Sequence, residues 1–204
     1  MAAARPLSRD RILKAAFAIA DKRGLEAVTM RSVAGRLDVE AMSLYHHVPS
    51  KKAMLNGLVD LLIQVAAMPA GEVTAEEWIR GTAAGLRSLA QQHPRLVPLL
   101  STRPVPLDDP ASALPFEAGL AAFTRSGYGL ADGFAALQAV AVALLAMTQL
   151  EAIATLEERT EEESALAALP VEDFPLLHQV LEAPAGLDEF WQTLVDGLVR
   201  GLTS

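Results

Sequence analysis

The chain has 204 residues, of which 51% are apolar, so it can bury one large hydrophobic core or two smaller ones. It contains no cysteine, which excludes disulfides and thiolate metal sites and fits a reducing cytoplasm. The net charge of −8, taken over the whole chain, argues against binding to nucleic acid.

The charge is divided unevenly along the chain. Residues 1–67 carry ten Lys or Arg and six Asp or Glu, a net charge of +4. Residues 68–204 carry seven Arg and nineteen acids, a net charge of −12. A basic N-terminal part on an acidic remainder is expected when only the N-terminal part faces phosphates. The first residues hold no apolar run long enough for a signal peptide, which predicts a cytoplasmic protein.

Four helices are predicted in the basic part. Ser8 is a favourable N-cap for the first helix, Gly24 ends it with a left-handed residue, and Thr29 caps the second. A third helix follows a tight turn, and Ser50 caps a fourth that runs to about Ala67. The pattern predicts one domain over residues 1–67, including this connecting helix, and another over residues 68–204.

The acidic part is also predicted to be helical. Thr74 to Glu77 form a capping box that begins a helix ending near His93. Six prolines in residues 94–115 allow only short helical pieces there. Further helices are predicted over residues 112–126, 132–158 and 172–183 and from Leu187 onward, with a charged loop over residues 157–163. No strand pattern occurs, so the predicted fold class is all-α: an N-terminal three-helix domain followed by a helical bundle.

The second and third predicted helices have the pattern of a helix-turn-helix. Each carries apolar residues on one face, and these are Val33, Ala34, Leu37, Val39, Leu44 and Val48. The outward positions of the third helix hold mostly residues that can form hydrogen bonds or stack. A helix-turn-helix places its second helix in the DNA major groove.

The run from Leu37 to Leu55, LDVEAMSLYHHVPSKKAML, resembles the recognition segment of the TetR (tetracycline repressor) family of bacterial transcription regulators. Asp38 departs from the family pattern, which has Gly at this turn, but Asp tolerates a left-handed backbone. The resemblance implies a homodimer that binds a palindromic double-stranded DNA operator. It carries DNA contact onto Arg31, Ala41, Met42, Ser43, Tyr45, His46 and Lys51 of this chain.

The chemistry of these residue types suits the implied role. Arg31 can pair with guanine, and Met42 can contact a thymine methyl group. Tyr45 and Lys51 suit phosphates, and Thr29, at a helix N-terminus, can add an anion contact. The alternative is a small helical subdomain that packs against protein. A metal site at the adjacent histidines His46 and His47 is disfavoured, because neighbouring helical residues point in different directions.

Residues 133–150 contain no charge and are long enough to span a membrane. The run is rich in alanine, holds two glutamines and lacks a basic flank, so a buried helix in a bundle is favoured and no membrane partner is predicted. In the family, the counterparts of this helix and of the last helix form a four-helix dimer interface. Four small residues would allow close approach there: Ala139, Ala143, Ala146 and Gly197.

The order of helices, STRP at residues 101–104 and the final FWQTLVDGLVRGL resemble the regulatory domain of the family's tetracycline-repressor branch. This resemblance implies a small-molecule ligand in the middle of the bundle. Leu99 stands where tetracycline-binding members have a His that contacts a drug–magnesium chelate, so an apolar or weakly polar ligand without metal is expected. The candidate ligand-binding residues are Trp78, Thr82, Leu86, Thr102, Arg103, Phe116, Gln138 and Met147.

No catalytic arrangement or cofactor site is predicted. His93 and His178 are isolated, and the GYGLADG run at residues 127–133 lacks the spacing and the strand of a dinucleotide-binding loop. The sequence predicts a homodimeric DNA-binding repressor that a small molecule releases from its operator. Two alternatives stay open: a regulator that needs its ligand as co-repressor or that activates, and a helical ligand-binding protein without a DNA role.

Overall fold

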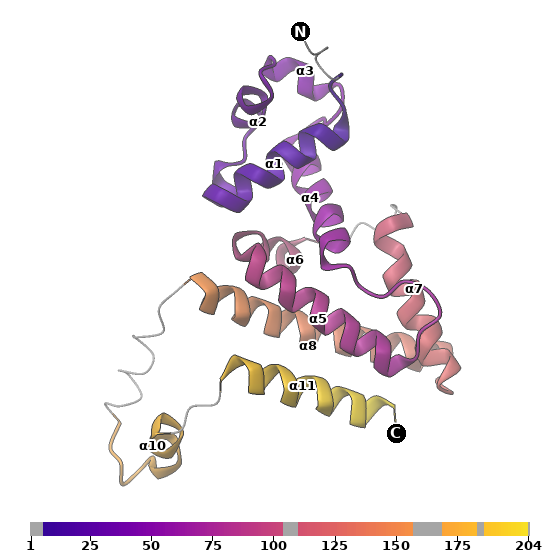
Figure 1. The fold of residues 1–204 in the computed structure, drawn as a ribbon, viewed down its shortest axis with the longest axis vertical. Coiled ribbons are helices and arrows are strands. Elements are labelled where there is room, and N and C mark those ends of the chain that lie inside the picture. Colours follow the sequence, from indigo (N-terminus) through magenta and orange to yellow (C-terminus); the bar gives the residue numbers. More distant parts are fainter. Residues whose placement is uncertain (1–5, 104–109, 157–168, 183–185, 204) are drawn as a thin grey trace.

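The computed structural model describes residues 6–103, 110–156, 169–182 and 186–203 (Figure 1). Over these ranges the chain is helical and contains no strand, which confirms the predicted all-α fold class. We call residues 6–50 the head and the described residues from 67 onward the body; helix α4 connects them. The head stands at one end of the molecule, and the body helices lie across the other end (Figure 1).

The head consists of α1 (Arg9–Arg23), a short 3-10 helix (Leu25–Ala27), α2 (Met30–Leu37) and α3 (Ala41–Tyr45). The predicted caps are present: the Ser8 hydroxyl accepts from the Arg11 backbone N–H at 3.3 Å, and the Thr29 hydroxyl accepts from that of Ser32 at 3.0 Å. Gly24 ends α1 with φ 81°, as expected, although its ψ of 166° lies outside the left-handed helical region that we predicted.

Helix α4 (Lys51–Ala66) begins at the predicted cap, where the Ser50 hydroxyl accepts from the Ala53 N–H at 3.0 Å. It packs against α1 of the head and against α5, α6 and α7 of the body. Its inward residues, including Leu58, Val59 and Leu62, are fully buried. A single hydrophobic cluster therefore extends from Ile12 in α1 through α4 to Val199 near the C-terminus.

The body contains α5 (Ala75–Gln92), a 3-10 turn (Pro94–Leu96), α6 (Pro98–Thr102), α7 (Pro110–Arg125), α8 (Leu130–Leu156), α10 (Pro175–Glu182) and α11 (Leu187–Leu202). Helix α7 begins two residues before the predicted start and contains Pro115 in its second turn. Pro110 occupies the first position of the helix, where no backbone N–H is needed, whereas Pro115 lies past the first turn and leaves α7 one backbone hydrogen bond short. The loop predicted over residues 157–163 lies outside the described residues.

Helix α8 is less buried in the single chain than we predicted for residues 133–150. Only 28% of an apolar 18-residue window of this helix is buried. One face packs against α5, α7 and α11, whereas the opposite face, which includes Val142 and Ile153, lies at the surface. Among the described helices, α8 alone has the length and hydropathy of a membrane span, which is weak evidence because core helices of soluble proteins share both properties.

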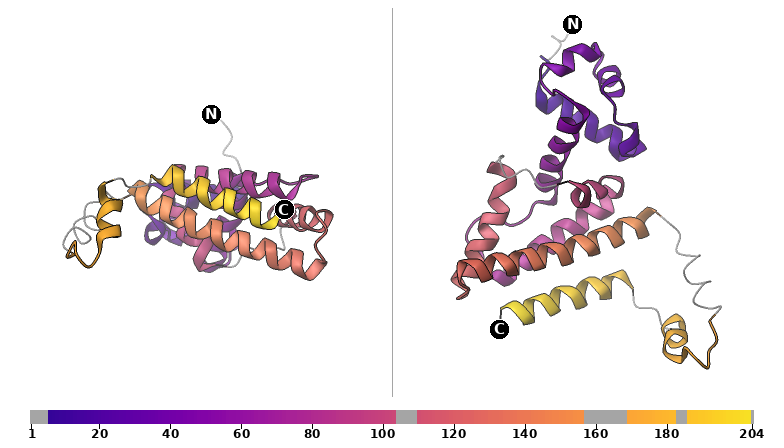
Figure 2. Two further views of the ribbon diagram at one scale, coloured as in Figure 1. Left: turned by 90° about the horizontal axis from the view of Figure 1, so that it is seen from below. Right: turned by 180° about the vertical axis from the view of Figure 1, so that it is seen from behind.

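Helix α11 lies alongside α8 and α5 in both views of the fold (Figures 1 and 2). The residues that it buries are Trp191, Val195 and Val199. The row that we predicted to be apolar (Phe190, Leu194, Leu198 and Leu202) lies one residue to the side and is only partly covered. Helix α10 stands apart from the other body helices in the same views.

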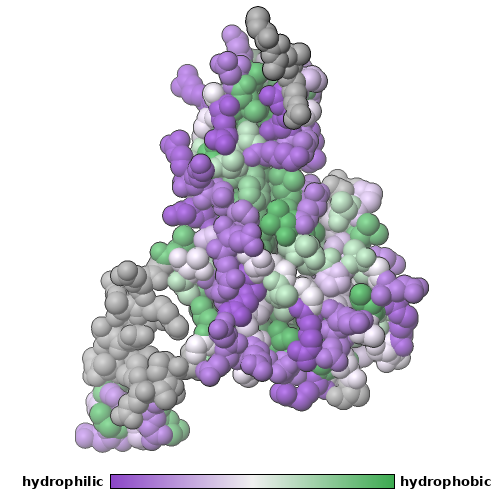
Figure 3. All heavy atoms as spheres, in the orientation of Figure 1, coloured by the Kyte–Doolittle hydropathy of each residue, from purple (hydrophilic) through white to green (hydrophobic). Residues whose placement is uncertain are grey.

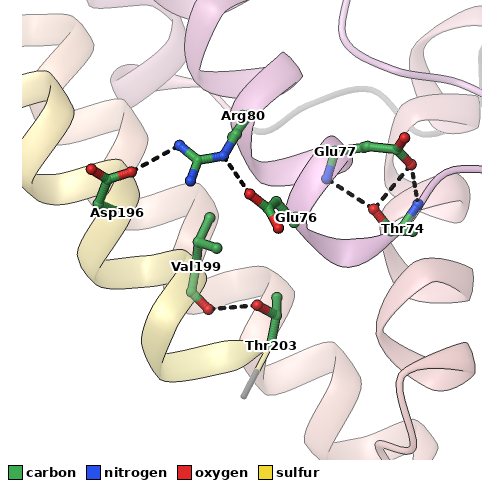
Figure 4. A network of polar contacts seen from close by, with 7 residues as sticks. All are labelled: Thr74, Glu76, Glu77, Arg80, Asp196, Val199 and Thr203. Carbon is green, nitrogen blue, oxygen red and sulfur yellow. Dashed lines mark hydrogen bonds and ion pairs between the residues drawn. The ribbon is translucent and has the colours of Figure 1, made fainter.

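Polar contacts fix α11 to α5 (Figure 4). The Arg80 guanidinium donates to Asp196 of α11 at 2.9 Å and to Glu76 at 2.7 Å. At the start of α5, Thr74 and Glu77 form the predicted capping box, with the Thr74 N–H donating to the Glu77 carboxylate at 2.8 Å. This backbone hydrogen bond and a second from the Thr74 hydroxyl hold the pKa of Glu77 below its ordinary value of 4.5.

Buried polar contacts join α5, α8 and α11 at the other end of the bundle. Glu151 of α8 is buried, and its carboxylate accepts from Trp191 Nε1 and Gln91 Nε2, both at 2.7 Å. Arg87 of α5 lies 3.5 Å from the same carboxylate. A buried carboxylate is stable only with such partners, so this cluster fixes the packing of the three helices.

Candidate DNA interface and ligand cavity

The turn between α2 and α3 sets the angle between the two helices. Asp38 adopts φ 55° and ψ 47°, the left-handed conformation that its position at the turn predicted. The Val39 N–H donates to the Ala34 carbonyl at 3.1 Å, which closes the end of α2. Asp is one of the few residues besides glycine that tolerate this conformation, and its side chain is exposed here, so the turn forms without glycine.

The inner faces of α2 and α3 pack into the core of the head. Val33, Leu44 and Val48 have at most 1% of their surface exposed. Ala34 is also buried, and Leu37 and Val39 pack at the edge of the same cluster. The apolar residues that defined the helix-turn-helix pattern therefore hold α3 against the head and leave its other face outward.

The outward face of α3 is open to solvent. Met42 and Tyr45 have 71% and 44% of their surface exposed, and His46 is also exposed. Ala41 and Ser43 are partly covered. These exposed side chains are free to contact another molecule.

The remaining candidate DNA contacts flank α3. Arg31 on α2 is exposed, and Lys51 at the start of α4 is partly covered. The Thr29 hydroxyl already accepts from the Ser32 N–H and lies 3.1 Å from the Ser32 hydroxyl, so its capping role occupies much of its hydrogen-bonding capacity. None of the eight predicted DNA-contact residues is buried. In the head, at the top of Figure 3, hydrophilic residues lie along the outer edges and hydrophobic residues lie between them.

A cavity of about 240 Å³ lies in the body between α4, α5, α6, α7 and α8. Five of the eight predicted ligand-binding residues line it: Trp78, Thr82, Leu86, Phe116 and Gln138. Trp78, Thr82 and Leu86 follow each other at intervals of four on α5, so they face the cavity together. A second hollow of about 460 Å³ between α7 and α8 shares Phe116 and Gln138 with the cavity.

Sequence reasoning missed six other lining residues. Ile63 is on α4, Met68 directly follows that helix, and Leu100 is on α6. Ala141, Val142 and Leu145 follow Gln138 on α8. The spacing of these α8 residues from Gln138, at i+3, i+4 and i+7, is a helical face that the sequence already contained and that could have identified them.

Three predicted ligand-binding residues do not line this cavity. The Thr102 hydroxyl donates to the Pro98 carbonyl at 2.8 Å within its own helix. Arg103 turns toward α4, where it donates to Asn56 Oδ1 at 2.8 Å. Met147 packs against the core at a different position on α8. The prediction placed all three from their sequence neighbourhood, whereas helix rotation and local hydrogen bonds decide which way they face.

Among the described residues that line the cavity, only Thr82 and Gln138 carry polar side-chain groups besides the Trp78 indole. Trp78 Nε1 donates to the Pro115 carbonyl at 2.7 Å, so this donor is occupied. Its ring lies against Gly119 of α7, where an added Cβ would come within 2.5 Å of it. Gln138 is exposed. Thr82 has 2% of its surface exposed, and its hydroxyl oxygen is buried without a hydrogen-bond partner.

Polar contacts tie the head and α4 to the body. The buried Asp60 of α4 accepts from the Ser112 hydroxyl of α7 at 3.0 Å and lies 3.6 Å from the Arg9 guanidinium of α1. His93 at the end of α5 lies 2.8 Å from the Asp21 carboxylate of α1, and its ring packs edge-on against Phe17 at 5.0 Å. A movement of the head relative to the body has to rearrange these contacts. The described residues contain no group of three or more potential metal ligands.

Comparisons with known proteins agree with the geometry of the head. Residues 12–58 match the family model of bacterial regulatory proteins of the tetR family. An HTH-type transcriptional regulator of Saccharopolyspora erythraea is 32% identical over 164 residues, which cover 79% of this chain and 68% of that protein. The tetracycline repressor protein class D of Escherichia coli is 28% identical over 203 residues, 96% of this chain and 88% of the repressor.

A solved structure shares the whole fold. The TetR family protein ActR of Streptomyces coelicolor, in complex with (S)-DNPA, superposes with a TM-score of 0.81 over 97% of this chain and 98% of ActR. The two sequences are 21% identical, so the likeness concerns the fold. The arrangement of an N-terminal head, a connecting helix and a helical body is thus common to this chain and to ActR.

Proposed function

The chain belongs to the TetR family of bacterial regulatory proteins and is a DNA-binding transcription regulator, not an enzyme; from this premise we propose that it is a homodimeric repressor. The repressor binds a palindromic operator in the cytoplasm, and a small molecule in the body cavity releases it. Residues 1–67 form the DNA-binding domain, and residues 68–204 bind the ligand and dimerise.

The surface and charge of the head support the DNA-binding half of this proposal. The inner face of α3 is buried, and its outer face exposes Met42 and Tyr45 to solvent. Residues 1–67 carry a net charge of +4. In the proposed complex α3 enters the major groove, where Arg31 and Met42 contact base edges and Tyr45 and Lys51 contact phosphates. Ala41, Ser43, His46 and Thr29 complete the contact surface.

The uncovered faces of α8 and α11 support the dimer. Phe134, Val142, Leu150 and Ile153 of α8 have between 39% and 69% of their surface exposed, an unusual run for a helix of a monomer. Ala139, Ala146 and Gly197 are exposed on the same two helices. A second copy would bury these faces, and its head would supply the contact to the second half-site of the operator.

The position of α4 is the observation that most directly supports release by a ligand. One end of this helix packs against α1 of the head, and Ile63 near its other end lines the cavity. A ligand that presses on Ile63 and Met68 would turn α4 and change the separation of the two recognition helices from the ~34–36 Å of one DNA turn. A coupling of typically ~1–3 kcal/mol corresponds to a loss of operator affinity of about five- to 150-fold.

A substitution that fills the cavity tests this mechanism without knowledge of the ligand. Ala141→Phe adds a ring to the cavity wall formed by α8, and it is expected to lower affinity for DNA flanking the gene by about five- to 150-fold. Fluorescence anisotropy measures the affinity, and circular dichroism checks that the variant is folded. The matched control is Ala84→Phe, the same change at an exposed position of α5.

The outcomes separate the candidate mechanisms. A folded Ala141→Phe variant with unchanged operator affinity would contradict release through the cavity. An increased affinity would instead favour a regulator that needs its ligand as co-repressor. If the wild-type chain does not bind the DNA that flanks its gene, the proposal of a repressor released by its ligand is contradicted.

A further inference from the structure

The hydroxyl of Thr82 lacks the hydrogen bond that other threonines in or next to the helices form. The hydroxyls of Thr102, Thr124, Thr148 and Thr155, and that of Thr203 directly after α11, each donate to the carbonyl four residues earlier. This is the usual way to satisfy a threonine hydroxyl in a helix. The Thr82 oxygen has no hydrogen-bond partner, although 98% of the residue surface is covered.

The residue that carries the unpartnered hydroxyl lines the cavity. Thr82 lies between Trp78 and Leu86 on the face of α5 that lines the cavity. A buried polar group without a partner is costly, so such groups are uncommon in folded proteins and call for a specific explanation. A ligand group that forms a hydrogen bond with the hydroxyl would remove this cost.

The remaining lining restricts the rest of the ligand. Within the described part of the chain no charged side chain lines the cavity, and the Trp78 N–H is already bonded to Pro115. An ion would lose its hydration there without gaining an opposite charge. An engineered cavity of ~150 Å³ holds benzene, so this cavity of 240 Å³ has room for roughly ten non-hydrogen atoms.

From these observations we propose, building on the function above, that the ligand is a neutral, mostly apolar molecule with one buried polar group that hydrogen-bonds Thr82 Oγ1. Its apolar part lies against Trp78 and Phe116. Any second polar group is at the opposite end, where Gln138 is exposed to solvent. Thr82 is therefore the residue that determines which apolar compounds the cavity selects.

Three compounds with the same two-ring skeleton test the proposal. Naphthalene has no polar group, 1-naphthol has one neutral hydroxyl, and 1-naphthoate carries a negative charge. Isothermal titration calorimetry on the full chain measures their binding. The expected order is 1-naphthol, then naphthalene about five- to tenfold weaker, with 1-naphthoate weaker still. Naphthalene cannot form a hydrogen bond with Thr82, and 1-naphthoate can form one only by losing the hydration of its charge.

Two matched variants assign the preference to one hydroxyl. Thr82→Val replaces the hydroxyl by a methyl group of similar size, and it is expected to abolish the preference for 1-naphthol while naphthalene binding stays the same or improves. Thr148→Val is the control, since Thr148 is equally buried on α8, bonds to Leu144 at 2.6 Å and does not line the cavity. It should keep the wild-type order.

The proposal is overturned if none of the compounds binds, if naphthalene or 1-naphthoate binds as well as 1-naphthol, or if Thr82→Val keeps the preference. Operator binding is measured on the same preparations by fluorescence anisotropy. Wild-type protein that binds operator but shows no preference for 1-naphthol contradicts only the inference about Thr82. Protein that prefers 1-naphthol but binds no operator contradicts only the proposed repressor.

Discussion

Arg31 and Tyr45 are the two exposed residues of the head on which the proposed operator recognition depends most. The Arg31 guanidinium can form two parallel hydrogen bonds with guanine, and the Tyr45 hydroxyl can donate to a phosphate. The base contact of Arg31 contributes ~1–3 kcal/mol and the phosphate contact of Tyr45 adds to it. Replacing both by alanine in the two heads of the dimer should therefore weaken operator binding by about 100-fold or more. Fluorescence anisotropy at a fixed salt concentration measures this loss.

An exposed arginine of the body provides the control for this double variant. Arg125→Ala removes the same charge as Arg31→Ala at an exposed site of α7, which packs against α4, α5 and α8, so operator affinity should stay close to wild type. Circular dichroism should show that both proteins are folded. Undiminished binding by the Arg31→Ala, Tyr45→Ala protein would exclude α3 as the helix that reads the operator.

At the scale of single residues, the caps and the turn of the head could be predicted because their causes are local. Ser8, Thr29 and Ser50 accept backbone N–H groups three residues ahead, a bond that needs no distant partner. Ala67 could not be predicted. It adopts φ 47° and ψ 41° at the end of α4, which alanine disfavours, while the neighbouring Met68 is buried at the cavity.

Among the helices, the crossing of α4 and α5 depends on one glycine. A Cβ at Gly85 would lie 1.9 Å from the carbonyl oxygen of Ala66, a backbone atom that cannot turn away. Gly85→Ala should therefore separate the two helices and lower the free energy of unfolding by about 2–3 kcal/mol. Urea denaturation followed by circular dichroism measures the change.

The same substitution at another helical glycine is the comparison for Gly85. Nothing lies within 4 Å of a Cβ added at Gly35 of α2. Alanine there should raise the free energy of unfolding by up to ~1 kcal/mol, the difference in helix propensity. Equal stability of the Gly85→Ala protein and the wild type would show that the crossing can widen without cost.

At the scale of helices, the sequence predicted where each helix lies better than which face it buries. Helical periodicity and caps are visible along the chain, so α5, α8 and α11 begin and end close to their predicted bounds. The face that α11 buries, with Trp191 and Val195, depends on partners about 40 and 110 residues earlier, such as Glu151 and Arg80. For the same reason the sequence identified Trp78 and Thr82 but missed Ile63 and Val142, which other helices bring to the cavity.

For the molecule as a whole, the outer face of α8 decides whether the chain works as a dimer. Ile153 has 51% of its surface exposed at the end of this face. In the proposed dimer, Ile153→Glu places a charge in an apolar interface without an opposite charge nearby, so the dimer should dissociate. Sedimentation equilibrium should then give the mass of one chain, 21.7 kDa, and operator affinity should fall with the loss of the second head.

Leu114 on α7 offers a matched change outside the proposed interface. It is exposed to a similar degree, 56%, so Leu114→Glu introduces the same charge at a comparable surface site. This protein should remain a dimer and keep its operator affinity. A wild-type chain that sediments as a single copy at operator-binding concentrations would contradict the twofold arrangement.

The continuous core along α4 also limits how the head can move. Apolar packing joins α4 to α1 of the head, so we expect α4 and the head to turn together as one lever. The 16 residues of α4 span about 24 Å, and a rotation of ~5° about the cavity end shifts the other end by about 2 Å. Two such levers, turning in opposite directions in a symmetric pair, would alter the distance between the heads by about twice that amount. A small ligand can thus misalign both heads with the DNA while the helices themselves stay intact.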